Sequence, residues 1–325
     1  MRRSLLFAVL LVAAGGCKKD KPKALEKVEQ PPPRDAAPTV SKEEAAARAV
    51  QTLTGQCEEA QRVTPHDAGA SSGGDLSGGE ESLESCRALG VLYADGTGVP
   101  ADPVRARELF TRACDGGVVK ACNNLGLLYA SGIGIEPDPP RAAELYRKAC
   151  DGKDPLGCRN LGLMLEGGRG VKADPAAAAA LFDQACKAGA AFACTNLGMA
   201  YRDGRGVKAS PEKARELFHQ ACERGDPTAC RNLGVLYLEG KGVKQGVAAA
   251  AVWLERACKG NDPVGCRLFG VMLLEGKGMP ANQEAARATL TRACEMNDKP
   301  ACEVMVTKGW AVKNEAKENE KEKTP

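Results

Sequence analysis

The chain has 325 residues, of which 27% are charged and 4% are aromatic, and its formal net charge is +3. A charge so close to balance, without a basic stripe carrying interleaved aromatic residues, argues against nucleic acid as a partner. The 15 cysteines are the unusual feature of the composition. Paired thiols at regular spacing indicate an oxidising compartment outside the cytosol.

The first 17 residues predict an export signal. Arg2 and Arg3 give a basic start, an apolar run extends from Leu5 to Ala14, and small residues precede Cys17. The run is too short to cross a bilayer as a helix, so we expect it to be cleaved. A cysteine directly after small residues resembles the lipobox of bacterial lipoproteins. That resemblance implies that Cys17 is lipidated and becomes the new N-terminus.

The number of cysteines supports lipidation of Cys17. Without this residue 14 cysteines remain, an even number that can pair completely. The alternative is ordinary cleavage, with Cys17 as a spare thiol. Some bacterial lipoproteins carry an aspartate after the cysteine, which retains them at the inner membrane. Lys18 stands there in this chain, which favours the outer membrane, facing the periplasm or the cell surface.

Two charged segments flank the part that is expected to fold. Residues 18–40 are rich in Lys, Glu and Pro and have few large apolar side chains. Such a segment cannot bury enough surface to fold, so it is predicted to be a tether. Residues 313–325 are predicted to be an unstructured tail for the same reason. The folded part is expected over residues 41–312.

The folded part is predicted to begin with a helix that Ser41 and Glu44 open as a capping box and that Cys57 ends. Between Cys57 and Cys86 lie 28 residues. The stretch 68–81 within them is rich in Gly and Ser, and its composition is typical of a flexible insertion.

From Cys114 onward, cysteine pairs recur with a period of 36 residues. Two cysteines with seven residues between them return without a slip. The pairs are Cys114 with Cys122, Cys150 with Cys158, Cys186 with Cys194, Cys222 with Cys230, Cys258 with Cys266 and Cys294 with Cys302. A fixed period of this length predicts an all-α solenoid of helical repeats, not a domain built around one central core.

Each unit is predicted to hold two helices. In the unit that starts at Cys122, the residues Leu125, Leu128 and Tyr129 follow helical spacing and define the first helix. Its interior glycine, Gly126, costs about 1 kcal/mol relative to alanine. We expect a neighbouring backbone to come close at this glycine.

A Gly-x-Gly is predicted to close the first helix of each unit, since glycine adopts the left-handed conformation of a helix end. The six pairs are Gly96 and Gly98, Gly132 and Gly134, Gly168 and Gly170, Gly204 and Gly206, Gly240 and Gly242, and Gly276 and Gly278.

The second helix of each unit begins at Asp-Pro or an equivalent, such as Asp138-Pro139 and Ser210-Pro211. The Asp or Ser side chain caps the helix, and proline takes its first position. The predicted buried face of this helix is represented by Ala142, Leu145, Tyr146 and Ala149, and in a later unit by Ala214, Leu217, Phe218 and Ala221.

Each cysteine pair therefore straddles the turn between the second helix of one unit and the first helix of the next. The two thiols can approach without long-range folding, so we predict six disulfides within the pairs. A seventh is predicted between Cys57 and Cys86. The alternative is pairing within each helix pair, as Cys86 with Cys114 and Cys122 with Cys150. It would leave Cys57 and Cys302 at opposite ends of the array.

The repeated motifs Asn-Leu-Gly-x-x-Tyr, Gly-x-Gly-Val, Asp-Pro-x-x-Ala-x-x-Leu-Phe and Ala-Cys resemble the Sel1-like repeat (SLR), a relative of the tetratricopeptide repeat, over residues 41–312. The added cysteine pairs are similar to those of the Helicobacter cysteine-rich proteins. The resemblance implies a right-handed superhelix of antiparallel helix pairs with disulfides between neighbouring helices. It implies an adaptor that binds proteins, or else a protein that binds or weakly hydrolyses β-lactams.

The β-lactam hypothesis finds little support in the residues themselves. Ser210 and Lys213 form a Ser-x-x-Lys, as in penicillin-recognising serine enzymes, but Ser210 occupies a helix-capping slot. The Gly-x-Ser-x-Gly at 69–73 lies in low-complexity sequence. His66 and His219 stand at positions expected to be on the surface. The sequence predicts no catalytic residue, no cofactor and no metal site.

A binding surface is better supported. Four consecutive units carry an asparagine two residues after the first-helix cysteine, namely Asn124, Asn160, Asn196 and Asn232. In tetratricopeptide relatives, asparagines on the concave face hold a peptide backbone or a carboxylate. Arg159 and Arg231 precede this slot and could add charge-assisted hydrogen bonds. The alternative is that each asparagine satisfies a local turn.

The sequence as a whole predicts a lipid-anchored envelope scaffold that binds a protein or peptide on the concave face of the solenoid. The alternative function is a β-lactam-binding protein or weak β-lactamase, with a β-lactam or peptidoglycan-like ligand. A spacer without a specific ligand is a third possibility.

Overall fold

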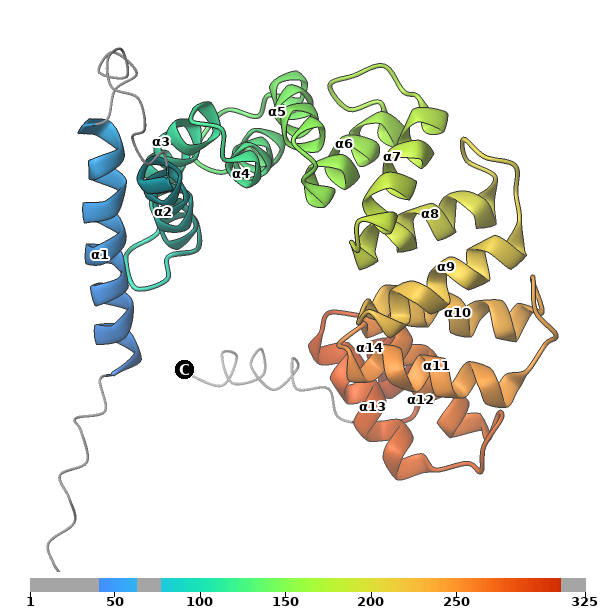
Figure 1. Ribbon diagram of the computed structural model, residues 1–325. Helices are drawn as coiled ribbons and strands as arrows, with labels where there is room; N and C mark the ends of the chain where they lie inside the picture. The colour runs from blue at the N-terminus through green and yellow to red at the C-terminus, as the bar shows by residue number, and fades with distance from the viewer. Residues whose placement is uncertain (1–40, 63–76, 311–325) are drawn as a thin grey trace, which may run out of the picture. The chain divides into compact units, whose positions relative to one another are not determined.

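The structure is a computed structural model that describes residues 41–62 and 77–310. These residues form fourteen α-helices and no strand (Figure 1). By its contacts the chain divides into Met1–Ser41 and Lys42–Pro325, and every helix belongs to the second unit. The predicted all-α solenoid is confirmed.

Odd-numbered and even-numbered helices alternate along the chain. The odd helices are α1 (Lys42–Arg62), α3 (Pro103–Asp115), α5 (Pro139–Asp151), α7 (Pro175–Lys187), α9 (Pro211–Glu223), α11 (Val247–Lys259) and α13 (Gln283–Glu295). The even helices are α2 (Ser77–Asp95), α4 (Val119–Ser131), α6 (Pro155–Gly167), α8 (Ala191–Asp203), α10 (Pro227–Glu239), α12 (Pro263–Glu275) and α14 (Lys299–Thr307).

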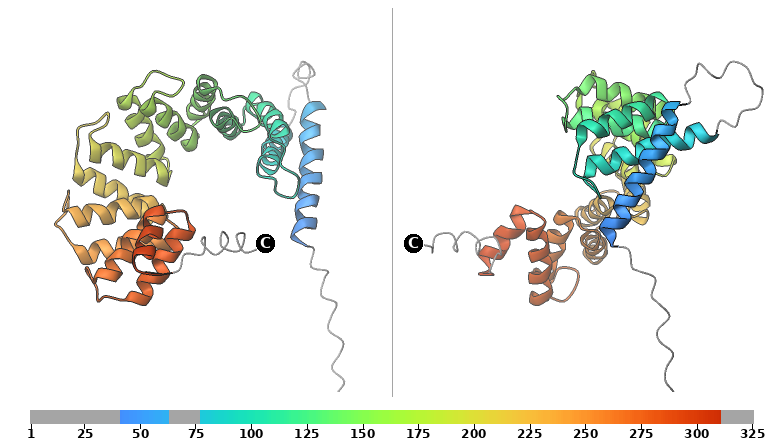
Figure 2. Two further views of the ribbon diagram at one scale, coloured as in Figure 1. Left: turned by 180° about the vertical axis from the view of Figure 1, so that it is seen from behind. Right: turned by 90° about the vertical axis from the view of Figure 1, so that its left-hand side faces the viewer.

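Every helix packs against the helices before and after it in the chain (Figures 1 and 2). The repeating unit is an even helix followed by an odd helix. From α4 to α12, each even helix also contacts the next even helix. Because alternate helices of a curved array approach one another on its inner side, the even helices form that side.

The predicted helix ends are confirmed. The Asp138 carboxylate accepts a hydrogen bond from the Arg141 amide at 3.0 Å, and Pro139 is the first residue of α5. Gly132 ends α4 in the left-handed conformation, with φ of 72°. Its amide donates to the carbonyl of Leu128, so the end of the helix is satisfied.

The second glycine of each Gly-x-Gly joins neighbouring repeats. Gly170 has φ of 70°, and a Cβ there would collide with the backbone of Pro139 at the start of α5. Gly206 lies against Pro175 at the start of α7 in the same way. The loop of one repeat thus rests on the odd helix of the preceding repeat, at a distance that only glycine allows.

The interior glycine of the even helices faces a side chain, not a backbone as we expected. A Cβ on Gly198 would lie 2.6 Å from the ring of Phe218, and Gly162 meets Phe182 in the same way. A large side chain from the odd helix of the same repeat fills the space that a Cβ would need. The glycine is therefore a packing partner for that ring.

The odd helices supply a narrow, alanine-rich core. Ala142, Leu145, Tyr146 and Ala149 of α5 are each at most 5% exposed, which confirms the predicted buried face. Burial raises the pKa of Tyr146 to about 12, against the opposing charge of Arg169. In α9 the corresponding Leu217 is only partly buried.

Seven disulfides join consecutive helices in the pairing that the spacing predicted, with Cα–Cα distances between 4.3 and 4.9 Å. One connects α1 to α2, and six connect an odd helix to the even helix of the next repeat. They pair Cys57 with Cys86, Cys114 with Cys122, Cys150 with Cys158, Cys186 with Cys194, Cys222 with Cys230, Cys258 with Cys266, and Cys294 with Cys302. The alternative pairing within each helix pair is therefore not the one that this structure forms.

The cysteines of the even helices lie deep in the seam between repeats, except Cys302 of α14, which is partly buried. Cys158, Cys230 and Cys266 are each at most 2% exposed, so these sulfurs are shielded from solvent and face the preceding odd helix. Cys57 does not end its helix as we predicted, because α1 continues to Arg62.

Several predictions fall outside the described residues. These are the signal with Cys17, the tether 18–40, His66, the motif at 69–73 and the tail 313–325. The predicted insertion 68–81 is partly wrong, because α2 begins at Ser77 and residues 77–81 are helical. No described helix has both the length and the apolar character needed to span a membrane.

Removal of one disulfide tests how far the repeats depend on these links. We expect the double change Cys186→Ala and Cys194→Ala to cost about 2.5 kcal/mol in the chain-entropy model, because the closed loop is short. The break lies in the middle of the array, so urea unfolding followed by circular dichroism should become broader or split. The same change at Cys294 and Cys302 should loosen only the last helices. Equal, single transitions in both variants would contradict nearest-neighbour coupling.

Two glycine substitutions test the packing of the even helices. Gly198→Ala should lower stability by about 1–3 kcal/mol, because the new methyl group meets the Phe218 ring. Gly55→Ala in α1 is the control, since nothing lies within 4 Å of its Cβ position. It should raise stability by about 0.5–1 kcal/mol through helix propensity. A shift of the same sign for both variants in thermal unfolding would refute this account.

Candidate binding surface

The even helices leave one surface uncovered on the inner side of the array. Residues one, two and five positions after the even-helix cysteine share a helix face. We call this surface, from α2 to α12, the even-helix face. The residues five positions after the cysteine are all apolar and all retain solvent exposure. They are Val91, Leu127, Leu163, Met199, Val235 and Val271, and we call them the apolar row.

The four predicted asparagines lie on this face, and two of them connect neighbouring even helices. Asn160 Nδ2 donates to Asn123 Oδ1 at 2.8 Å, and Asn196 Oδ1 accepts from Arg159 Nε at 3.0 Å. Asn124 is partly exposed. These hydrogen bonds of Asn160 and Asn196 therefore reach back to the preceding even helix, and neither is a local turn contact.

Asn232 differs from the other asparagines. It is 6% exposed, and its side-chain amide nitrogen is buried without a hydrogen-bond partner among the described residues. The hydroxyl of Thr195, on the neighbouring helix α8, donates instead to Asp226. A buried donor without an acceptor costs about 1–3 kcal/mol, so this position is not optimised for stability.

The residue directly after the cysteine connects one even helix to the start of the next. Arg231 donates to the Asp262 carboxylate at 3.0 Å, and Arg267 donates to Asp298 at 2.8 Å. Both aspartates are N-caps of the following even helix. Burial raises the pKa of Asp262, while the Gly265 amide and Arg231 oppose that shift.

Arg159 differs from the other arginines in this slot, since Arg87 pairs with Glu84 of its own helix. The position 31 residues further on is Ala190, where the ion pairs of α10 and α12 have an aspartate. The guanidinium donates to Asn160 and Asn196 instead, and it lies 5.7 Å from the centre of the Phe192 ring. Burial lowers the pKa of Arg159, and the charge of Asp226 opposes this. Arg159 is thus a half-buried cation that makes no ion pair with the described residues.

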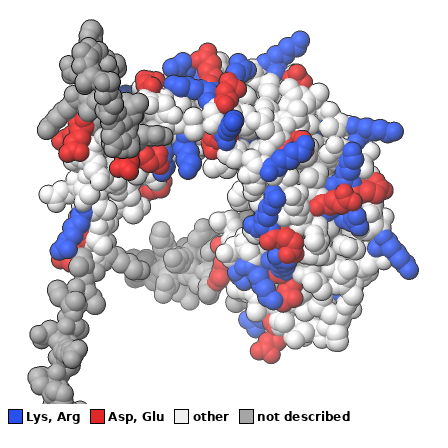
Figure 3. Space-filling view, viewed as in Figure 1, with Lys and Arg blue, Asp and Glu red and all other residues white. Residues whose placement is uncertain are grey.

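Exposed apolar side chains surround this arginine. Phe192 is 51% exposed and Leu156 is 48% exposed, in the first turns of α8 and α6. Leu127 of the apolar row is 46% exposed on α4. On the face that Figure 3 shows, acidic and basic residues are interspersed and neither sign dominates. The middle repeats therefore combine exposed apolar side chains with one cation, Arg159, that has no ion-pair partner among the described residues.

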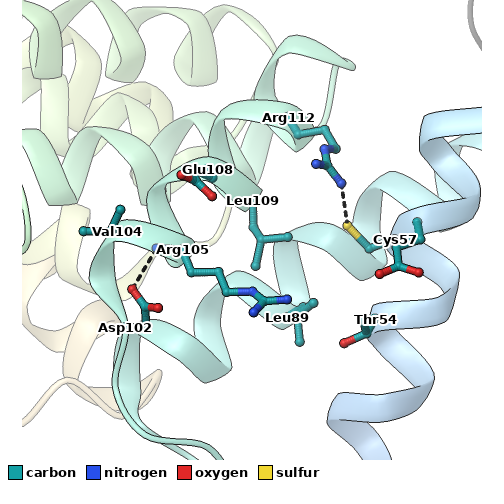
Figure 4. Close-up of a pocket in the computed structure, with 10 residues that line it drawn as sticks. Thr54, Cys57, Leu89, Asp102, Val104, Arg105, Glu108, Leu109 and Arg112 are labelled. Carbon is teal, nitrogen blue, oxygen red and sulfur yellow. Dashed lines mark hydrogen bonds between the residues drawn. The ribbon is translucent and has the colours of Figure 1, made fainter.

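Besides an open cavity of about 470 Å³ lined by Tyr201, Ser210 and Lys213, two further open cavities lie elsewhere in the array. The first, of about 440 Å³, is lined by residues of α1, α2 and α3 that include Thr54, Leu89, Arg105 and Glu108 (Figure 4). The second, of about 390 Å³, lies at α9 and α10 beside His219 and Tyr237. His219 is exposed, as predicted, and stands edge-on to Trp253 at 5.3 Å. Neither cavity sets a nucleophile against a base.

Ser210 is a helix cap, as the sequence predicted. Its hydroxyl oxygen accepts from the Lys213 amide at 3.3 Å, and its proton is donated to Glu212. The Lys213 ammonium lies 5.0 Å from the centre of the Tyr201 ring. The Ser-x-x-Lys motif is therefore the first turn of α9.

Two leucine variants test whether these asparagines contribute to stability. Asn196→Leu should cost about 1–3 kcal/mol, because the Arg159 guanidinium loses an acceptor. Asn232→Leu should be neutral or stabilising, since it removes a buried donor without a partner. Leu268 already occupies the same slot in α12. Chemical denaturation of both variants tests this, and a larger loss for Asn232→Leu would disprove it.

Comparison with known families and structures shows which proteins this chain is similar to. A model of the Sel1 repeat matches residues 83–118, 119–154, 155–189, 191–226, 227–262 and 264–298. Comparison with curated proteins found no match.

Among solved structures, the chain is similar to a protective antigen of uropathogenic Escherichia coli with an SLR fold. The identity is 27%, the TM-score is 0.62, and the match covers 78% of this chain and 50% of that one. This chain thus spans half the length of that relative. A Sel1 repeat protein from Oxalobacter formigenes is 23% identical, with a TM-score of 0.62 and coverage of 78% and 97%.

Helicobacter pylori cysteine-rich protein B is 30% identical, with a TM-score of 0.35 and coverage of 41% of this chain and 96% of that one. The six matched segments span well over half of the chain, and each of the second to the fifth holds one whole even helix and one whole odd helix. The protein therefore belongs to the Sel1 repeat family.

Proposed function

We propose that this protein is an exported scaffold that binds a protein or peptide on its even-helix face. The observation that carries the proposal is the apolar row, which stays at least partly exposed on six consecutive even helices beside the asparagine and arginine positions. An uncovered stripe of this kind can take an extended chain that contacts one repeat after another.

The family membership supports a binding role. Sel1 repeats are typical of protein–protein interaction scaffolds, and they act by the surface that stacking creates. The seven disulfides indicate an oxidising compartment outside the cytosol. A partner is therefore expected in that compartment.

The proposal includes a lipid anchor at Cys17, followed by the tether 18–40, on the outer membrane. It rests on the sequence before Cys17 and on the even number of cysteines that remain without this residue. A tether of 23 residues would let the solenoid reach partners at some distance from the membrane. A β-lactam or peptidoglycan-like ligand is not part of the proposal, because Ser210 is engaged as a helix cap.

Site-specific photo-crosslinking in cells tests the proposed face. A benzophenone amino acid at Leu163 or Met199 should capture a partner, because both residues belong to the apolar row. The same probe at Ala180 of α7 or Val252 of α11 is the control, since both are exposed on odd helices. Crosslinks at the control positions but not at the apolar row would place the binding surface elsewhere. Crosslinks at neither would favour a spacer.

A further inference from the structure

We propose that Arg159 binds an acidic side chain of a partner peptide that lies extended across the even-helix face. The inference rests on the proposed function and names the chemistry of the partner. Its basis is the contrast between Arg159 and the other arginines of the same slot, two of which are paired with an aspartate within the protein.

The missing aspartate is a difference of side chain and not of backbone. Ala190 is the N-cap of α8, with φ of −71° and ψ of 103°. Asp262 occupies the same place before α12, with φ of −81° and ψ of 112°. An aspartate would therefore fit at 190, where it would both cap α8 and face Arg159. The chain therefore lacks this carboxylate at position 190, in the middle of the array.

The described residues do not replace this carboxylate. Arg159 has five N–H donors, and the oxygens of Asn160 and Asn196 take two of them. Asp226 attracts the guanidinium, but its oxygens are held by the Thr195 hydroxyl and the Thr228 amide. Asp226 is also only 1% exposed. An external carboxylate would supply the charge-assisted hydrogen bonds that Arg231 and Arg267 already have.

The surroundings favour an acidic side chain within a longer peptide. Apolar residues lie on both sides of Arg159 along the array, where Leu127 on α4 is exposed and Met199 and Val235 on later helices are partly exposed. A chain bound at Arg159 can therefore continue in both directions. Packed helices lie about 8–10 Å apart and an extended chain rises about 3.3 Å per residue. The partner motif is thus Asp or Glu with apolar residues about three positions before and after it.

A displayed library of random twelve-residue peptides, all followed by the same C-terminal linker, tests the motif directly. Selection against the oxidised protein should enrich peptides with one Asp or Glu between two apolar residues. Because of the constant linker, no peptide in this library can bind through a free C-terminal carboxylate. A matched library with free C-termini tests whether a C-terminal carboxylate binds instead of an acidic side chain. Enrichment there alone would overturn the assignment to an acidic side chain.

The best selected peptide is then measured by fluorescence anisotropy against two changes. Arg159→Gln keeps a hydrogen-bonding side chain but removes the charge, and should weaken binding about ten- to a hundredfold. Replacing the acidic residue of the peptide by its amide should weaken binding equally, and the two changes together should cost little more. Arg141→Gln, a surface arginine of α5 paired with Glu144, is the control and should leave binding unchanged.

Ala190→Asp removes any confusion with unfolding. It gives Arg159 an internal carboxylate and α8 a side-chain cap, so it should raise the melting temperature by about 2–4 °C. Peptide affinity should nevertheless fall at least tenfold. Val118→Asp places an aspartate at the uncapped start of α4 and should leave peptide binding unchanged. A stabilised Ala190→Asp variant that binds the peptide normally would overturn the proposal.

The remaining outcomes distinguish this inference from the function beneath it. Enriched peptides without an acidic residue, together with crosslinks at the apolar row, would refute the role of Arg159 and leave the scaffold function standing. A protein that enriches no peptide and forms no crosslink there would lose both. Self-association that Arg159→Gln abolishes would identify a second copy of the chain as the occupant and would also overturn the proposal.

Discussion

The seam between consecutive repeats is the constraint on which this structure depends. Each helix contacts its neighbours along the chain, and from α4 to α12 each even helix also contacts the next even helix, so no central core holds distant segments together. The stability of the array is then a chain of local contacts, and any weak seam interrupts it. At every seam from α3 onward a disulfide joins the odd helix to the following even helix. This covalent link compensates for a core in which alanine is the commonest buried residue.

Side-chain hydrogen bonds also stabilise the same seam. A side chain that is fully used in this way has no capacity left to bind a partner. The residue after the even-helix cysteine points to the start of the next even helix, as Arg231 and Arg267 show. Where both the arginine and the aspartate are present, their ion pair stabilises the fold. At Arg159 and Asn232 hydrogen-bonding capacity remains unused by the described residues. Stability is relinquished in the middle repeats, where the face retains its exposed apolar side chains.

Much of the fold could be predicted because its signals are local. Asp-Pro marks a helix start, glycine marks a helix end, and seven residues between cysteines leave only one convenient pairing. Each of these is decided within a short stretch of chain. The start of α2 inside a Gly/Ser-rich stretch was not predicted, because composition does not reveal packing against α1.

The partners of the interior side chains could not be read from local patterns. Gly198 faces Phe218 from the next helix, and sequence spacing alone does not say which atoms fill the gap. The arginine contacts join residues 31 positions apart, in different repeats. A search for Arg and Asp at that fixed separation would have found them, and would have shown that Arg87 and Arg159 lack an aspartate there.

The short disulfide loops have a mechanical consequence when the two ends of the array are pulled apart. From Cys114 onward the two cysteines of each disulfide are 8 positions apart in a 36-residue period, so only the remaining 28 residues of each period can extend while the protein is oxidised. At about 3.4 Å per residue, pulling would extend each repeat to about 95 Å, against about 120 Å after reduction. Each disulfide closes only a short loop across a turn, so the helices themselves still bear the pulling force. Under tension the helices would yield one repeat at a time, while each seam kept its two helix ends together and ready to refold in register.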